Sequence, residues 1–235
     1  MIDVHPPHES VHTWKDFLIH MSAICLGLLL AIGLEQTVEL IHHRHQRQEL
    51  QQQLHSDAER TLYDTQRDEA AMTARLQFLR ARADQVAASL QGQKLPSSVA
   101  ETDLVGDLPI DPAWDAAKSA GTLAVLPPED IKVFTELDGI MHVLYLTYQQ
   151  FAADNNKLDT FTWSIAGIGS NNLDIESLTP AQKHDYLLLL LESYRSTRDS
   201  RLWFRQLHGG TLAVAGGERD LKKINLAERQ FNNLP

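Results

Sequence analysis

The chain has 235 residues, of which 43% are hydrophobic and 22% charged, and its 31 acids against 21 bases give a formal charge of −10. This composition is typical of a folded acidic protein, and Gly and Pro are too few for a collagen-like or silk-like chain. The single Cys excludes an intrachain disulfide, a multi-thiolate zinc site and a Cys-x-x-Cys redox pair. The excess of acids argues against nucleic acid as the main partner, because phosphate binding relies on clustered Lys and Arg.

Residues 1–16 form an N-terminal tail, and an apolar segment follows it. Residues 17–34 contain no Asp, Glu, Lys or Arg, and as a helix they would rise about 27 Å. That length nearly spans a bilayer core of about 30 Å. Residues suited to the membrane interface flank the segment on both sides: Trp14, Lys15, Arg44 and Arg47. We therefore predict a transmembrane helix and its interface over residues 17–41.

Two other interpretations of this segment stay open. A cleaved signal peptide would have a basic start and a shorter apolar region, ending in small residues such as Ala31 and Gly33. Here the preceding tail carries more acids than bases, and the apolar region is longer than in most signal peptides. The other alternative is a helix buried in a protein core.

Small residues recur along one face of the predicted membrane helix. Ala23, Gly27 and Ala31 are spaced by four, and such small-xxx-small patterns let two membrane helices approach closely. A homodimer through this face is one expectation, and small residues facing lipid are the alternative. Glu35 continues the same face, and at the membrane edge we expect it to be solvated.

The charges close to the membrane bear on orientation. Lys15 precedes the predicted helix, whereas Arg44 and Arg47 follow it. Because Lys and Arg are enriched on the cytoplasmic side, this balance favours a cytoplasmic C-terminal part.

Residues 42–91 are expected to form a stalk and the first helix of a bundle, because no Gly or Pro occurs between Gly33 and Gly92. An apolar heptad pattern supports packing along a partner and comprises Met72, Leu76, Leu79, Ala83, Val86 and Leu90. Between Leu54 and Met72 the same face is mostly polar. We therefore expect the stalk to enter the bundle at about residues 58–70.

The remaining chain shows clear helix boundaries. Gly and Pro residues over 92–111 predict a long loop, and Asp111 followed by Pro112 predicts the start of a short helix that Gly121 ends. Further helices are expected over 128–165, over 180–208 with a stop at Gly209–Gly210, and over 218–232. The predicted fold is all-α: one N-terminal transmembrane helix continues as a long stalk helix into an antiparallel bundle, which residues 112–235 complete.

Three arginines are the strongest candidates for a binding surface. Arg198, Arg201 and Arg205 fall on one helical face and could receive an anion or an acidic partner. A solvated, ion-paired face is the alternative. Aromatic residues could also line a ligand pocket, although at helical spacing they are more often core; they are Trp114, Tyr145, Tyr148, Phe161, Trp163, Tyr186, Trp203 and Phe204.

No residue pattern predicts a metal, a cofactor or catalysis. Histidines at 5, 8 and 12 precede the membrane segment and those at 42, 43 and 45 follow it, so a spanning helix would separate them, and neither cluster has matched carboxylate or thiolate ligands. Cys25 at mid-membrane is expected to be an apolar filler. The chain lacks G-x-S-x-G, H-E-x-x-H, a P-loop and G-x-G-x-x-G. We therefore expect no catalytic activity.

Two stretches carry a resemblance. The first stretch consists of W-K-D-F-L-I-H at 14–20, G-L-L-L-A-I-G-L-E-Q at 27–36 and H-H-R-H at 42–45. It resembles a group of uncharacterised bacterial proteins with one N-terminal membrane helix. The second stretch consists of Ala113-Trp114 and the following Lys118-Ser-Ala-Gly121-Thr-Leu. It is similar to a W-x3-K-x-S-G-x-L motif of membrane-anchored domains of unknown function, although here Ala120 separates Ser119 from Gly121. The resemblance implies a bacterial inner-membrane setting and no activity, cofactor or catalytic residue.

These patterns favour a single-pass membrane-anchored helical protein that acts through protein-protein contacts, as a tether or accessory subunit. Its expected partners are the lipid bilayer, a second copy through the transmembrane helix and an unidentified protein. The alternative is a membrane-anchored sensor whose helical bundle binds a small ligand.

Overall fold

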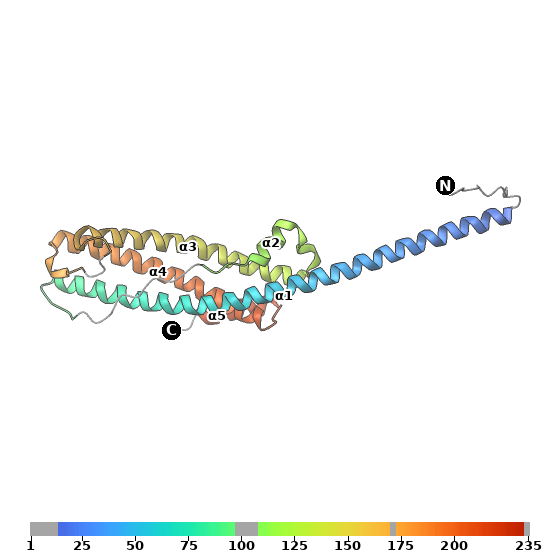
Figure 1. Ribbon diagram of the computed structural model, residues 1–235. Helices are drawn as coiled ribbons and strands as arrows, with labels where there is room; N and C mark the ends of the chain where they lie inside the picture. The colour runs from blue at the N-terminus through green and yellow to red at the C-terminus, as the bar shows by residue number, and fades with distance from the viewer. Residues whose placement is uncertain (1–13, 97–107, 170–172, 233–235) are drawn as a thin grey trace, which may run out of the picture. The chain divides into compact units, whose positions relative to one another are not determined.

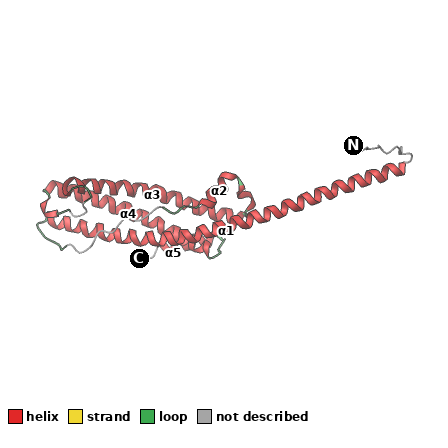
Figure 2. Ribbon diagram, in the orientation of Figure 1, coloured by secondary structure: helices red, strands yellow, loops and turns green. Residues whose placement is uncertain are grey.

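The computed structural model describes residues 14–96, 108–169 and 173–232, and within these ranges the chain is helical, without a β-strand (Figure 2). Short 3₁₀ turns cover Thr122–Val125 and Ile175–Ser177. The five α-helices of the described ranges are α1 (Trp14–Leu90), α2 (Pro112–Ala120), α3 (Pro128–Ala166), α4 (Pro180–Ala215) and α5 (Leu221–Asn232). The prediction of an all-α chain is confirmed. The histidines at 5, 8 and 12 and part of the predicted 92–111 loop lie outside the described residues.

The chain divides into two compact units, residues 1–49 and residues 50–235. The described part of the first unit is helix and includes an apolar 18-residue window with a mean hydropathy of 2.3, none of which is buried within the protein. Of the helices in the described ranges, α1 alone is long and apolar enough to cross a membrane. Exposure of so many apolar side chains to water is unfavourable, so this segment supports a membrane anchor.

The predicted interface and association residues all lie on exposed parts of α1. Trp14 stacks on Phe17 with 5.4 Å between ring centroids, and Arg44 and Arg47 are exposed. A Cβ atom added to Gly27 would meet no atom within 4 Å. The face of Ala23, Gly27 and Ala31 is therefore open, and association through it remains a prediction.

The helix starts in the second unit follow the local signals in the sequence. Asp111 accepts a hydrogen bond from the backbone N–H of Trp114 at 3.0 Å, and Gly121 ends α2 in the left-handed conformation with φ of +69°. Thr179 and Gln182 form a reciprocal capping box at the start of α4. These contacts satisfy backbone groups that a helix end leaves free.

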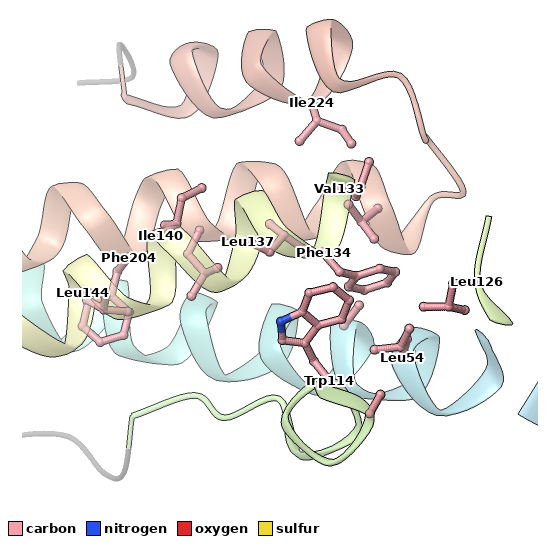
Figure 3. Close-up of a cluster of buried hydrophobic side chains, with 14 of the residues drawn as sticks. Leu54, Trp114, Leu126, Val133, Phe134, Leu137, Ile140, Leu144, Phe204 and Ile224 are labelled. Atoms are coloured by element: carbon pink, nitrogen blue, oxygen red, sulfur yellow. The ribbon is translucent and has the colours of Figure 1, made fainter. Parts of the chain in front are cut away.

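Two apolar clusters stabilise the second unit. The first surrounds Trp114 of α2, which is 2% exposed and stacks on Phe134 of α3 at 5.9 Å (Figure 3). The cluster also takes Leu54 from α1 and Ile224 from α5. The second cluster includes Leu79, Val86, Leu158, Tyr186 and Leu190. Its fully buried α1 members belong to the predicted heptad pattern.

Burial along α1 begins earlier than the sequence suggests. Leu50 and Leu54 are already part of the core, ahead of the expected entry at 58–70. The polar stretch that follows is buried as well, since Thr61 and Thr65 are 5% and 0% exposed. The polar residues on this face of α1 therefore lie in the interior, while those on the opposite face remain exposed.

Hydrogen bonds between the helices give their directions. Gln51 and Arg75 of α1 donate to Asp130 and Asn155 of α3, both at 2.8 Å, so the two helices run the same way (Figure 1). Helix α4 runs opposite to both, since Lys183 near its start donates to Ser89 near the end of α1 at 2.8 Å. A uniformly antiparallel bundle is therefore not confirmed.

The parallel pair has a simple cause in the position of α2. The backbone N–H of Ala113 donates to the carboxylate of Asp57 at 2.9 Å, which places the start of α2 beside the beginning of the buried part of α1. Between Leu90 and Ala113 the chain thus comes back to the level of Asp57 before α3 begins. A long connection allows this return, whereas a short one favours an antiparallel neighbour.

The predicted stop at Gly209–Gly210 is wrong, because α4 continues to Ala215. Both glycines are buried where α5 crosses α4. A Cβ atom on Gly210 would lie 2.8 Å from Glu228 Oε1 and 2.9 Å from Leu137 Cδ2. The glycines therefore provide room for close helix packing and do not end the helix.

This packing predicts that Gly209→Ala destabilises the protein by about 1–3 kcal/mol. The added methyl group would lie 3.0 Å from the backbone oxygen of Ala227 and 3.1 Å from Glu228 Cα, and so would overpack α4 against the backbone of α5. Gly139→Ala in α3 is the matched control, since its Cβ would meet no atom within 4 Å. That substitution should be neutral or stabilising by up to about 1 kcal/mol. Thermal unfolding of both variants in detergent, followed by circular dichroism, measures the difference; equal effects would contradict the assigned role of Gly209.

Candidate functional site

The most unusual group of side chains in the second unit is a set of polar and charged residues between α1 and α4, which we call the polar seam. It consists of Thr65 and Glu69 from α1 and of Arg201, Arg205 and His208 from α4. Charged groups at a helix interface are costly unless they are paired and hydrogen-bonded. Their partners therefore decide what this region can do.

Glu69 is the acid of the polar seam. Its Oε1 accepts a hydrogen bond from Arg205 Nε at 2.5 Å and lies 4.0 Å from Arg201 Nε. The side chains of Glu69, Arg201 and Arg205 are 22%, 21% and 11% exposed. Two guanidinium groups share this carboxylate, which leaves an excess of one positive charge among the three residues.

The excess charge affects Arg201 most. Burial, and then the charge of Arg205, lower the pKa of Arg201 from its ordinary value, while Glu69 raises it. Its Nε is buried and has no hydrogen-bond partner among the described residues. Arg201 is therefore the less well satisfied of the two arginines.

The hydroxyl and imidazole of the polar seam do not form a nucleophilic pair. Thr65 Oγ1 lies 3.2 Å from His208 Nδ1, but its hydrogen is directed to the backbone oxygens of Thr61 and Leu62. Thr65 is fully buried, so a substrate has no access to it. Burial also lowers the pKa of His208. This geometry favours a packing role for both residues.

A second polar group joins three helices further along α1. Arg75, 2% exposed, donates to Asn155 Oδ1 at 2.8 Å, and Ser193 of α4 donates to the same oxygen at 3.0 Å. Asn155 itself donates to the backbone oxygen of Phe151 at 2.8 Å. The Asn155 amide therefore links α1, α3 and α4 and aligns Arg75 and Ser193 at the same height along the bundle.

A pair of acids lies where α2 meets α1. Asp57 accepts from the Ala113 N–H and from Arg60 at 2.7 Å, and Asp111 caps α2. Burial, together with the neighbouring Asp57, raises the pKa of Asp111 to about 7. The sequence indicates the cap but not the second carboxylate, because Asp57 is distant along the chain.

The predicted arginine face is divided in the structure. Arg201 and Arg205 belong to the polar seam, whereas Arg198 is exposed and donates to its neighbour Asp199 at 2.9 Å. The three residues thus do not form one anion site in this structure.

The aromatic residues are also divided. Trp114, Tyr148, Trp203 and Phe204 belong to the first apolar cluster, while Phe161 and Tyr186 stack at 5.5 Å in the second. Tyr145 and Trp163 are 50% and 39% exposed. They therefore do not line one common pocket.

A cavity of about 660 Å³ lies near the end of α1 and the 3₁₀ turn at Ile175–Ser177. Arg82 donates to the backbone oxygen of Leu173 and to Gln85 there, which positions its guanidinium. The described ranges hold no group of three His, Cys, Asp or Glu side chains that could bind a metal. The described lining residues are Arg82, Gln85, Lys94, Leu95, Pro96, Leu173, Asp174, Ile175 and Glu176.

The polar seam predicts that Glu69→Ala destabilises the fold by about 3 kcal/mol, because it removes the carboxylate from two largely buried guanidinium groups. Arg198→Ala is the matched control on the same helix, where an exposed pair contributes at most about 1 kcal/mol. Urea unfolding of the detergent-solubilised chain compares the two. Small and equal losses would show that Glu69 does not stabilise the α1–α4 contact.

Comparison with known proteins adds no relative: no protein-family model, curated protein or solved structure matches this chain.

Proposed function

We propose that this chain is a single-pass membrane-anchored helical protein that acts through protein-protein contacts, as a tether or accessory subunit. The observation that carries the proposal is the exposed apolar segment of α1, none of which is covered by the protein itself. A bilayer would cover it, since its length as a helix is close to the thickness of the hydrocarbon core.

The second unit supports the proposal because it has its own core. Its two apolar clusters draw on residues from 50 onward, so the membrane segment contributes to neither. We infer that its helices form a bundle in which α4 runs antiparallel to both α1 and α3. Such a unit can present a helix face to a partner while the first unit attaches it to the bilayer.

Helix α4 offers a surface for such contacts. Leu188, Leu191 and Leu202 are 48%, 50% and 42% exposed, and with the exposed Arg195 and Arg198 they follow a three-four spacing typical of helix packing. The chemistry of this surface fits an amphipathic partner helix with acids opposite the two arginines.

The finer localisation is part of the same proposal. The resemblance supports the bacterial inner membrane, and Arg44 and Arg47 against Lys15 favour a cytoplasmic second unit. A homodimer through Ala23, Gly27 and Ala31 would place two such units together.

The proposal predicts that the full-length chain stays in the membrane pellet after alkaline carbonate extraction, whereas the chain lacking residues 14–49 becomes soluble and keeps its helical circular dichroism. Protease treatment of sealed vesicles in the same preparation reads the side on which the second unit lies. Recovery of a soluble protein whose N-terminus follows Ala31 or Gly33 would identify a cleaved signal peptide and contradict the anchor.

The cavity of about 660 Å³ favours one second candidate, a membrane-anchored sensor of a small ligand. Its volume is in the range of small-molecule sites, and its lining combines Arg82 and Lys94 with Asp174 and Glu176. Binding to the folded state would raise the melting temperature of the full-length chain, and a metabolite with this effect would favour the sensor.

A further inference from the structure

Glu228 is an acid buried at the contact between α5 and α4. The residue is 3% exposed, and its Oε1 has no hydrogen-bond partner among the described residues. Gln206 of α4 donates to Oε2 at 3.4 Å, a long hydrogen bond. The absence of a side chain at Gly210 leaves the space that the carboxyl group occupies.

The surrounding charges give this carboxyl little support. Burial is the largest influence on the Glu228 carboxyl, the hydrogen bond from Gln206 and the charge of Arg229 oppose it, and Glu136 of α3 adds to it, so that the pKa of Glu228 is raised to about 7. The ring centroid of His208 of α4 lies 4.9 Å from that of Phe231, with the two rings tilted by 57°, and the charge that acts on the imidazole is that of Glu69. The packed carboxyl is therefore mostly neutral below about pH 7.

Two glycines and a tethered arginine form the connection between α4 and α5. Gly216 and Gly217 follow α4, and Gly217 has φ of +88°. Arg219 then fixes the connection, because its Nε donates to Asp130 Oδ1 at 2.7 Å and its guanidinium lies over the ring of Phe134. The connection between α4 and α5 would thus stay attached to α3 through Arg219 while α5 moves.

Other polar atoms near this contact also lack partners. Thr211 Oγ1, next to Gly210 in sequence, and Asn225 Oδ1, one turn before Glu228, are buried and have no hydrogen-bond partner among the described residues. Buried polar groups without partners reduce the free energy gained by packing. The α4–α5 contact is therefore less well satisfied than the polar seam.

We propose that α5 is a pH-controlled latch: it packs on the Gly209–Gly210 surface of α4 while the Glu228 carboxyl is neutral, and it loosens when that carboxyl ionises. Loosening would expose the glycine surface and Phe231 to solvent. The latch belongs to the second unit and does not require the membrane anchor.

The sign and size of the effect follow from proton linkage. The packed form keeps a proton that the free helix releases above its ordinary pKa of 4.5. The stabilisation of packing is therefore complete below about pH 4.5, falls as the pH rises from there, and is lost above about pH 7. With a packed-state pKa of about 7, the ratio of packed to free α5 falls about tenfold between pH 6 and pH 8.

Hydrogen exchange of the full-length chain in detergent tests the latch. We expect peptides from residues 221–232 to lose about tenfold in protection between pH 6 and pH 8 after correction for intrinsic exchange, while peptides from the middle of α3 do not change. In Glu228→Gln, whose side chain is neutral at both pH values, the protection of α5 should be the same at pH 6 and pH 8.

Glu136→Gln supplies an independent readout. Removing this like charge should lower the pKa of Glu228 and move the midpoint of the change in α5 protection to lower pH. A purely structural effect of Glu136 would change protection equally at all pH values. Wild-type protection that is independent of pH, or a pH dependence that persists in Glu228→Gln, would overturn the proposal.

Discussion

Burial of charge between α1 and α4 is the constraint on which the folded unit depends. Glu69 must lie opposite Arg205, because either charge would be costly in this interface without the other. The same alignment brings Thr65 beside His208 and Lys183 beside Ser89. One register therefore satisfies contacts along the whole shared length of the two helices.

The third long helix is aligned by the same kind of contact. The side-chain oxygen of Asn155 accepts hydrogen bonds from both Arg75 and Ser193, so the position of α3 follows from the positions of α1 and α4. Apolar packing around Trp114 then joins α2 and the first turn of α5, through Ile224, to the three long helices. Polar contacts thus specify how the helices align, and apolar burial supplies most of the free energy that holds them together. The α4–α5 contact, with its partly satisfied acid, is the part best suited to change.

Signals that act within a few residues could be predicted from the sequence, because they depend on local backbone chemistry. The cap at Asp111 is confirmed, and so is the heptad pattern up to Val86, although Leu90 is 41% exposed. The capping box of Thr179 and Gln182 is a signal of the same local kind. Properties that depend on distant residues could not be predicted. Gly209–Gly210 resembles a helix stop until α5 is placed against it, and the acid opposite the predicted arginines, Glu69, is 136 positions from Arg205.

The parallel direction of α1 and α3 tests this account most directly, because it follows from the polar contacts and departs from the simplest antiparallel arrangement. Spin labels at the exposed positions Gln52, Lys132 and Thr160, introduced as cysteine pairs in a Cys25→Ala background, measure it by pulsed dipolar spectroscopy. We predict a short distance for Gln52 with Lys132 and one longer by tens of ångströms for Gln52 with Thr160, which lies about 40 Å further along α3. A shorter distance to Thr160 would contradict the account.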